Sequence, residues 1–266
     1  MNLLAAAQYP RIAECDSHLD AKSGFSSLWR HHSDIINSRL FARWLPVDRV
    51  GLLLKTDLFD EAVSEGLHAI MASHAKRVVG IDISSSVIEA ARFRYPLLEV
   101  VETDARRLPF ADGAFDVIVS NSTLDHFQSK DEIALSLREF HRILRPGGVL
   151  LLTLDNLANP LVALRNALPF PWLHRFGIVP YYVGATCYPD GLRTALHDAG
   201  LKLLELDAVM HCPRVFAVAA ARWMQKHAAP KSQKHFLSIL RAFEFLSCLP
   251  TRFFTGYFIA AKAMRP

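Results

Sequence analysis

Short apolar runs alternate with amphipathic segments along most of the chain. The apolar runs predict strands at residues 50–54, 77–82, 98–101, 116–120, 149–154, 201–207 and 256–262. Apolar residues at helical spacing predict helices over residues 65–74 and 190–199, between Ser84 and Pro96, and between Ser129 and Pro146. Continuous β-branched runs are typical of parallel strands that helices cover on both faces. The pattern therefore predicts a doubly wound α/β fold with a mostly parallel, seven-stranded sheet.

Polar residues at the helix ends refine these boundaries. Ser84 is placed to cap the helix that follows it, and Ser86 with Glu89 forms a capping-box pattern. Ser129 with Glu132 forms a second capping-box pattern. We expect the Pro-Gly-Gly sequence at 146–148 to end the later helix in a tight turn.

Some segments depart from the alternation of strands and helices. We expect residues 1–46 to form a helical N-terminal extension and residues 47–266 to form the α/β domain. Two insertions in this domain, at about 155–187 and 213–252, are expected to build a cap over the substrate. Apolar spacing predicts helices in the extension and in the second insertion, over residues 25–44, 214–228 and 234–247.

Charge and cysteine usage narrow the classes of partner. The net charge of the 266 residues is +4, but residues 213–252 contain seven basic side chains and one acidic one. Such a stretch indicates either an anionic partner or a solvated face. The four cysteines lack the spacing of a zinc site, and no apolar run is long enough to span a membrane. We therefore expect a cytoplasmic protein without a metal. The basic stretch either makes peripheral contact with an anionic membrane or forms a lid with a solvated surface.

From Val78 to Leu154 the chain carries an ordered series of short motifs. In order they are Val-Gly-Ile-Asp at 79–82, Asp104 followed by Leu-Pro-Phe at 108–110, Phe-Asp-Val-Ile at 115–118, Leu-Asp-His at 124–126 and Arg-Ile-Leu-Arg-Pro-Gly-Gly at 142–148. Their order and spacing resemble the class I S-adenosylmethionine-dependent methyltransferases of the small-molecule type. The resemblance covers about residues 47–210 and 256–263. It implies a Rossmann-like methyltransferase fold, S-adenosyl-L-methionine as cofactor and a small-molecule acceptor.

The resemblance also implies positions for the cofactor. In the family, the residue at the place of Asp82, followed here by Ile83, accepts hydrogen bonds from the ribose hydroxyls. The acidic residue at the place of Asp104 accepts from the adenine amino group, and the neighbouring backbone, here at Ala105, helps to fix the ring. Each residue also has a structural alternative: Asp82 suits a helix N-terminus, and Asp104 suits an exposed turn.

The polar pair that follows the fourth strand is a further cofactor candidate. Asn121 and Ser122 stand where the family places the methionine part of the cofactor. Both residue types also cap the element that follows them, so this alternative stays open.

The first cofactor loop departs from the family. There the family has an acidic residue and a glycine-rich turn, whereas residues 54–66 of this chain contain a single glycine, Gly66. In one register Asp57 takes the acidic position and Gly66 the last glycine position; in the other the strand ends at Leu54 and the loop is longer. Asp57 or Glu61 is then a candidate to bind the amino group of the cofactor. The alternative is a catalytically degenerate scaffold or regulatory subunit.

Asp125 and His126 are the first candidates for acid–base chemistry, and His211, Tyr181 and Tyr182 are further candidates. They follow the fourth strand, where the resemblance places the rim of the active site, and a base is needed only if the acceptor loses a proton. We expect a hydrophobic or lipid-linked acceptor because both insertions are rich in aromatic residues. Nucleic acid is not expected, since an Asn-Pro-Pro-Tyr type motif is missing after the fourth strand.

Overall fold

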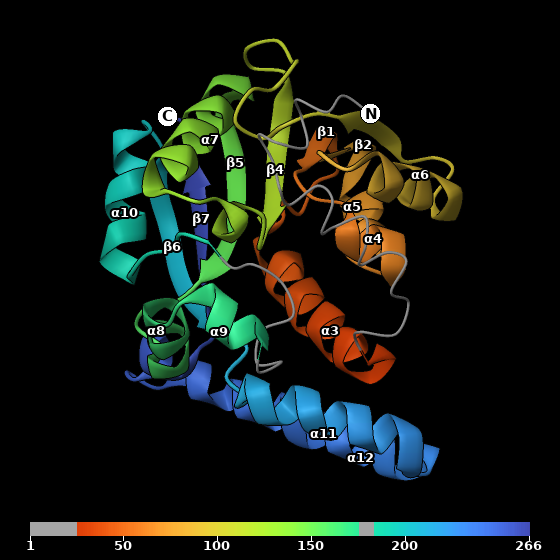
Figure 1. The fold of residues 1–266 in the computed structure, drawn as a ribbon. Helices are drawn as coiled ribbons and strands as arrows, with labels where there is room; N and C mark the ends of the chain where they lie inside the picture. The colour runs from red at the N-terminus through yellow and green to blue at the C-terminus, as the bar shows by residue number, and fades with distance from the viewer. Residues whose placement is uncertain (1–25, 176–183) are drawn as a thin grey trace.

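The computed structural model describes residues 26–175 and 184–266 (Figure 1). The first 25 residues of the expected extension lie outside this part. Within the described residues the strands form one seven-stranded sheet in the order β3-β2-β1-β4-β5-β7-β6. The strands are β1 (Val50–Lys55), β2 (Ala75–Asp82), β3 (Glu99–Glu102), β4 (Phe115–Asn121), β5 (Leu144–Asp155), β6 (Lys202–Val209) and β7 (Phe258–Met264). All neighbouring pairs are parallel except those made by β7, which runs antiparallel to β5 and β6. The expected fold class is confirmed.

Helices cover both faces of this sheet. The described helices are α3 (Ser27–Trp44), α4 (Phe59–Val63), α5 (His68–His74), α6 (Ser85–Arg94), α7 (Lys130–Ile143), α8 (Pro160–Ala167), α9 (Phe170–Arg175), α10 (Pro189–Asp198), α11 (Arg214–His227), α12 (Pro230–Ala242) and α13 (Arg252–Thr255). Two 3-10 turns, η1 (Leu124–His126) and η2 (Phe243–Cys248), complete the described elements. None of the described helices combines the length and the apolar character that crossing a membrane requires.

Successive residues of the central strands point to opposite faces of the sheet and pack in two separate hydrophobic cores. Leu53 and Val117 face the core shared with α3, α5, α6, α11 and α12, whereas Leu54 and Ile118 face the core shared with α7 and α10. All four side chains are fully buried. The two-residue period of a strand explains this division, and burial of each such side chain contributes roughly 1.5–3 kcal/mol.

Several expected boundaries are confirmed, whereas the Ser86 cap, the end of α7 and the starts of two helices are wrong. One of these helices, predicted over 234–247, begins at Pro230. Ser84 caps α6 by accepting the Val87 N–H, and Ser129 with Glu132 forms a complete capping box. The pattern at Ser86 is not a cap, because Ser84 already occupies the N-cap position. Helix α7 ends at Ile143 rather than at the Pro-Gly-Gly sequence, which lies within β5, where Gly147 has a φ of +77°.

The other wrong helix start lies in the first loop, where the predicted helix 65–74 begins only at His68. The preceding residues contain α4, which the sequence pattern did not predict. A helix of five residues is too short to show a 3.6-residue repeat of apolar positions.

His32 on α3 is a buried histidine with little hydrogen bonding. Its Nε2 lies 3.7 Å from the Cys212 Sγ, and its Nδ1 has no partner among the described residues. Burial, with the charges of Arg241 and His31, lowers the pKa of His32 to about 4. The folded protein therefore binds its proton less readily than the unfolded chain does.

We expect the free energy of unfolding to contain a term from His32 that is lost as pH falls. Between pH 6.5 and 4 the unfolded chain binds more protons than the folded protein does. The free energy of unfolding therefore falls by about 3 kcal/mol as pH drops through that window, and His32 does not change it above pH 6.5. Urea unfolding of wild type and His32→Leu at a series of pH values isolates this term, because other titrations cancel in the difference. The exposed neighbour provides the control: His31→Leu should keep the wild-type slope, and an unchanged slope in His32→Leu would contradict the assignment.

Candidate active site

A buried lysine ends strand β1 at the first loop. The Lys55 Nζ lies 3.2 Å from Glu61 Oε2 and donates a short hydrogen bond to the carbonyl oxygen of Asp57, and the side chains of Lys55 and Glu61 are fully buried. The other carboxylate oxygen of Glu61 accepts the Leu67 N–H at 2.8 Å. Gly66 has a φ of +55°, and a Cβ there would lie 2.7 Å from Glu61 Oε1. Glu61 and Gly66 thus belong to the internal frame of this loop.

The loop then crosses the end of β2. The Asp57 carboxylate accepts the Phe59 N–H at 2.9 Å, while Asp82 accepts the Leu58 N–H at 3.0 Å and the Ser84 N–H at 2.9 Å on separate oxygens. The buried side chain of Leu58 covers Gly80, where a Cβ would lie 2.5 Å from Leu58 Cδ2. The loop therefore packs a leucine side chain directly against a glycine of β2.

Carboxylates outnumber cations around Lys55. Burial raises the pKa of Asp60 and of Glu61, and the positive charge of Lys55 only partly offsets this effect. Burial, together with the negative charge of Asp57, also raises the pKa of Asp82. Burial alone would lower the pKa of Lys55, but these carboxylates outweigh it and the pKa is raised. The strand ends therefore hold more carboxyl groups than cations, and a positively charged ligand would favour the ionised form of these carboxyl groups.

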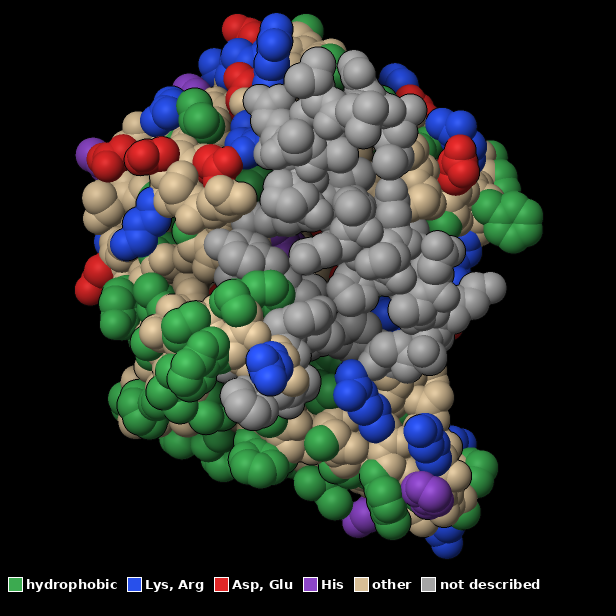
Figure 2. Space-filling view, viewed as in Figure 1, with side chains coloured by type: hydrophobic (Ala, Val, Ile, Leu, Met, Phe, Trp, Pro, Cys, Tyr) green, Lys and Arg blue, Asp and Glu red, His purple; other side chains and the backbone are tan. Residues whose placement is uncertain are grey.

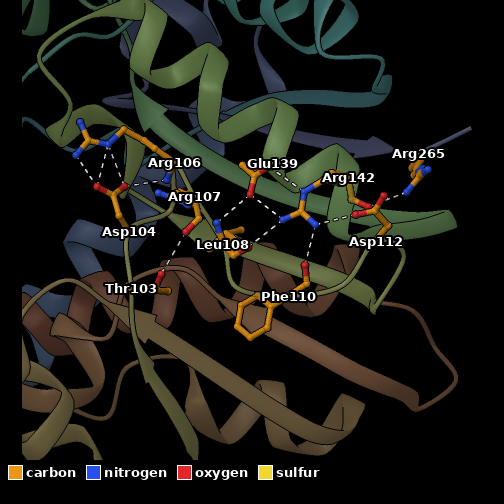
Figure 3. Close-up of polar contacts among 10 residues, drawn as sticks. All are labelled: Thr103, Asp104, Arg106, Arg107, Leu108, Phe110, Asp112, Glu139, Arg142 and Arg265. Carbon is orange, nitrogen blue, oxygen red and sulfur yellow. Dashed lines mark hydrogen bonds and ion pairs between the residues drawn. The ribbon is translucent and has the colours of Figure 1, made fainter.

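Asp104 lies at the turn after β3 with its carboxylate bound by an arginine (Figure 3). The Arg106 Nε donates to Asp104 Oδ1 at 2.9 Å, and the Arg106 backbone N–H donates to the same oxygen at 2.8 Å. Arg106 also pairs with Glu132, the capping-box residue of α7. An adenine amino group that binds Asp104 would therefore share the carboxylate with Arg106.

A second arginine fixes the rest of this turn to α7. Arg142 donates to the carbonyl oxygens of Leu108 at 3.0 Å and Phe110 at 2.7 Å, and Glu139 accepts the Leu108 N–H at 2.8 Å (Figure 3). Arg142 also pairs with Glu139 and Asp112. Two motifs that the sequence showed separately, Leu-Pro-Phe and Arg-Ile-Leu-Arg-Pro-Gly-Gly, are thus in direct contact. Sequence spacing revealed both motifs but not their pairing.

The end of β4 is tied to its neighbours by polar side chains. Asn121 accepts a hydrogen bond from the Thr153 hydroxyl at 2.9 Å, and the Ser122 N–H donates to the same hydroxyl at 2.9 Å. Thr56 and Thr123 share a hydrogen bond of 2.8 Å across β1 and β4. Ser122 adopts a φ of +50°, a backbone conformation that residues other than glycine rarely adopt and that tends to occur at functional sites.

Asp125 lies in a buried ionic cluster at the ends of β4 and β5. Its Oδ2 accepts the Asp155 N–H at 3.3 Å, and Asp155 pairs with Arg165 at 2.7 Å. Burial, followed by the charge of Asp155, raises the pKa of Asp125 to about 6. His126, next to it, is half-buried. The sequence did not indicate Asp155 and Arg165 as site residues; its only signal was an acidic residue at the end of a predicted strand.

The other residues that the sequence proposed for the site differ in their surroundings. Ile83 is partly exposed beside Asp82, and Ala105 is buried beside Asp104. Tyr181 and Tyr182, which the sequence also offered as bases, lie outside the described residues. His211 is buried and shares a hydrogen bond of 2.8 Å with the Thr255 hydroxyl, so it has a structural partner.

Comparison with known proteins places this geometry in a family. Residues 62–152 match a family model described as a methyltransferase domain. A demethylmenaquinone methyltransferase of Chlorobaculum parvum is 37% identical over 90 residues, which cover 32% of this chain and 36% of that protein. A probable S-adenosylmethionine-dependent methyltransferase of Mycobacterium tuberculosis is 27% identical over 160 residues, which cover 60% of this chain and 53% of that protein.

Solved structures share the fold at low sequence identity. The crystal structure of geranyl diphosphate C-methyltransferase from Streptomyces coelicolor matches with a TM-score of 0.55 and 15% identity, over 86% of this chain and 77% of that one. The chain spans only about a third to a half of the length of the two relatives matched by sequence. The domain match, the relatives and the sheet order together show that the chain carries a methyltransferase domain of the class I S-adenosylmethionine-dependent type.

Proposed function

We propose that this chain binds S-adenosylmethionine at the carboxyl ends of β1, β2 and β4 and transfers its methyl group to a small hydrophobic acceptor. The buried excess of carboxylates around Lys55 carries the proposal. The cofactor brings a sulfonium and an ammonium group, and opposite charge favours the ionised form of buried carboxylates. The domain match supports it, since residues 62–152 include Asp82, Asp104 and Asn121.

Four of the cofactor candidates have a role in this proposal. Asp82 accepts hydrogen bonds from the ribose hydroxyls, and Asp104, shared with Arg106, accepts from the adenine amino group. Asn121 and Ser122 contact the methionine part of the cofactor. When bound, the cofactor supplies an electrophilic methyl group, so the chain mainly has to hold the acceptor in line with it.

We place the acceptor beneath the two insertions, 155–187 and 213–252. The Chlorobaculum relative is named for a methylation of demethylmenaquinone, which supports a hydrophobic, lipid-linked acceptor. If the acceptor carries a proton, His126 takes it with the negative charge of Asp125 beside it. A turnover rate that stays unchanged in His126→Gln would remove His126 from this role.

The main test is calorimetric titration of the protein with S-adenosylmethionine, with S-adenosylhomocysteine and with adenosine. We expect binding of the first two in the micromolar range, with adenosine binding more weakly because it brings no positive charge to the carboxylates. Methyl transfer to extracted quinone precursors from labelled cofactor then tests the acceptor class. Absence of heat at millimolar cofactor would contradict the proposal.

One observation favours the alternative of a degenerate scaffold. Asp82 already accepts two backbone N–H groups, and the side chain of Leu58 fills the space above Gly80. A scaffold would show no cofactor binding in the titration and no stabilisation by the cofactor in thermal unfolding.

A further inference from the structure

Exposed apolar side chains lie on a continuous series of elements. The Asn159 side chain, at the start of α8, donates to the carbonyl oxygen of Thr255 in α13 at 3.0 Å. Helix α13 packs on η2, η2 packs on α12, and α12 packs on α11. These five elements therefore form one connected surface.

Each of these elements leaves at least one large apolar side chain in solvent. The exposed fractions range from 47% to 72% for Leu164, Phe216, Trp223, Ile239, Phe245 and Phe254. These six side chains and the basic residues of α11 and α12 together make up the docking face. Exposed apolar side chains on neighbouring elements mark an interaction site where they gather into a patch.

The charge of the docking face has one sign. Arg222, Lys226, Lys231 and Lys234 are exposed on α11 and α12. Residues 208–266 contain one acidic side chain, Glu244, which accepts the backbone N–H groups of Met210 and His211. Figure 2 shows apolar side chains gathered over α8 and continuing along the lower edge of the molecule, with Lys and Arg among them at α11 and α12. The acidic side chains seen in this view lie over the upper half.

The docking face lies at the functional end of the sheet. Figure 1 shows α8, α11 and α12 beyond the end at which β5 terminates. The ionic cluster of Asp125 and Asp155 lies at that same end, as do Lys55 and Asp82, because parallel strands share the direction of their carboxyl ends. A surface on which this face rests would therefore lie close to the acceptor side of the site.

We propose that the docking face binds the surface of an anionic phospholipid membrane. The aromatic and aliphatic side chains would enter the boundary between headgroups and acyl chains, while the lysines and arginines contact the phosphates. A second copy of the chain fits less well, because it would bring two basic surfaces together. The proposal does not require cofactor binding, and it gives the proposed enzyme direct access to a lipid-linked acceptor.

Sedimentation with vesicles tests this proposal. We expect the full chain to bind vesicles of phosphatidylcholine with phosphatidylglycerol, to bind pure phosphatidylcholine weakly, and to dissociate in high salt. Lys226→Gln with Lys234→Gln should weaken binding by on the order of tenfold or more, since each basic residue contributes about a factor of five. Phe216→Ser with Trp223→Ser should weaken binding to anionic vesicles at all salt concentrations.

Matched substitutions on α6 serve as controls. Phe93 and Arg92 are exposed there, outside the docking face, so Phe93→Ser and Arg92→Gln should bind like wild type. Lipids with brominated acyl chains should quench Trp223. Trp29 and Trp44 are buried but Trp172 is exposed, so Trp223→Phe has to be compared with Trp172→Phe, and only the first should remove most of the quenching. Equal binding of all variants, or no binding to anionic vesicles, would overturn the proposal. A dimer that Phe216→Ser dissociates would assign the face to a second copy instead.

Discussion

Replacing Asp82 with alanine is expected to weaken the binding of S-adenosylmethionine by at least about 100-fold. Two hydrogen bonds from ribose hydroxyls to a carboxylate are worth about 3 kcal/mol together, which corresponds to that factor. The carboxylate is held for this role at the end of β2, with only 8% of the residue exposed and both oxygens oriented by backbone N–H groups. Calorimetric titration of the variant beside wild type measures the effect.

The same substitution leaves the N–H groups of Leu58 and Ser84 without their acceptor, so stability has to be measured with affinity. We expect a lower melting temperature but a folded protein, and Asp82→Asn should restore part of the stability because its amide oxygen still accepts one bond. Glu89→Ala, on the exposed side of α6, is the control and should bind like wild type. A folded Asp82→Ala protein with wild-type affinity would remove Asp82 from the cofactor site.

The fold could be predicted because its signals are local and repeated. Buried strands of the central sheet, such as β1 and β4, contain short apolar runs at 52–54 and 117–119, and the capping box at Ser129 marks the start of α7 in sequence alone. These features need no knowledge of distant residues. The family resemblance then placed Asp82 and Asp104 on neighbouring strand ends, which the parallel pairing of β2 and β3 reproduces.

The parts that sequence did not show are pairings between distant residues. Arg106 meets Glu132, and Asp155 meets Arg165, across loops and helices that carry no mutual signal. A lysine inside an apolar strand end, such as Lys55, would ordinarily be taken as an exposed residue, since lysine is rarely buried unless it is paired. Its partner, Glu61, lies in α4, the short helix that the apolar pattern could not predict.

Replacing Lys55 with methionine is expected to destabilise the fold by about 3–5 kcal/mol, because it leaves the buried carboxylate of Glu61 without its cation. The loss should be visible as a melting temperature lowered by roughly 10 °C. The exposed pair between Arg77 and Glu99 offers a matched comparison across β2 and β3, and Arg77→Met should change the melting temperature little, since solvent screens that pair.

Combining Lys55→Met with Glu61→Leu separates the ion pair from the packing around it. With both charges removed, the double variant should be more stable than the sum of the two single losses predicts, by on the order of 1–3 kcal/mol in a denaturant-unfolding cycle. Additive losses would show that Lys55 acts through packing or through Asp60 rather than through Glu61. If the double variant folds and still binds S-adenosylmethionine, the pair serves the loop's stability. If it folds but no longer binds, the pair sets the loop conformation that the cofactor requires.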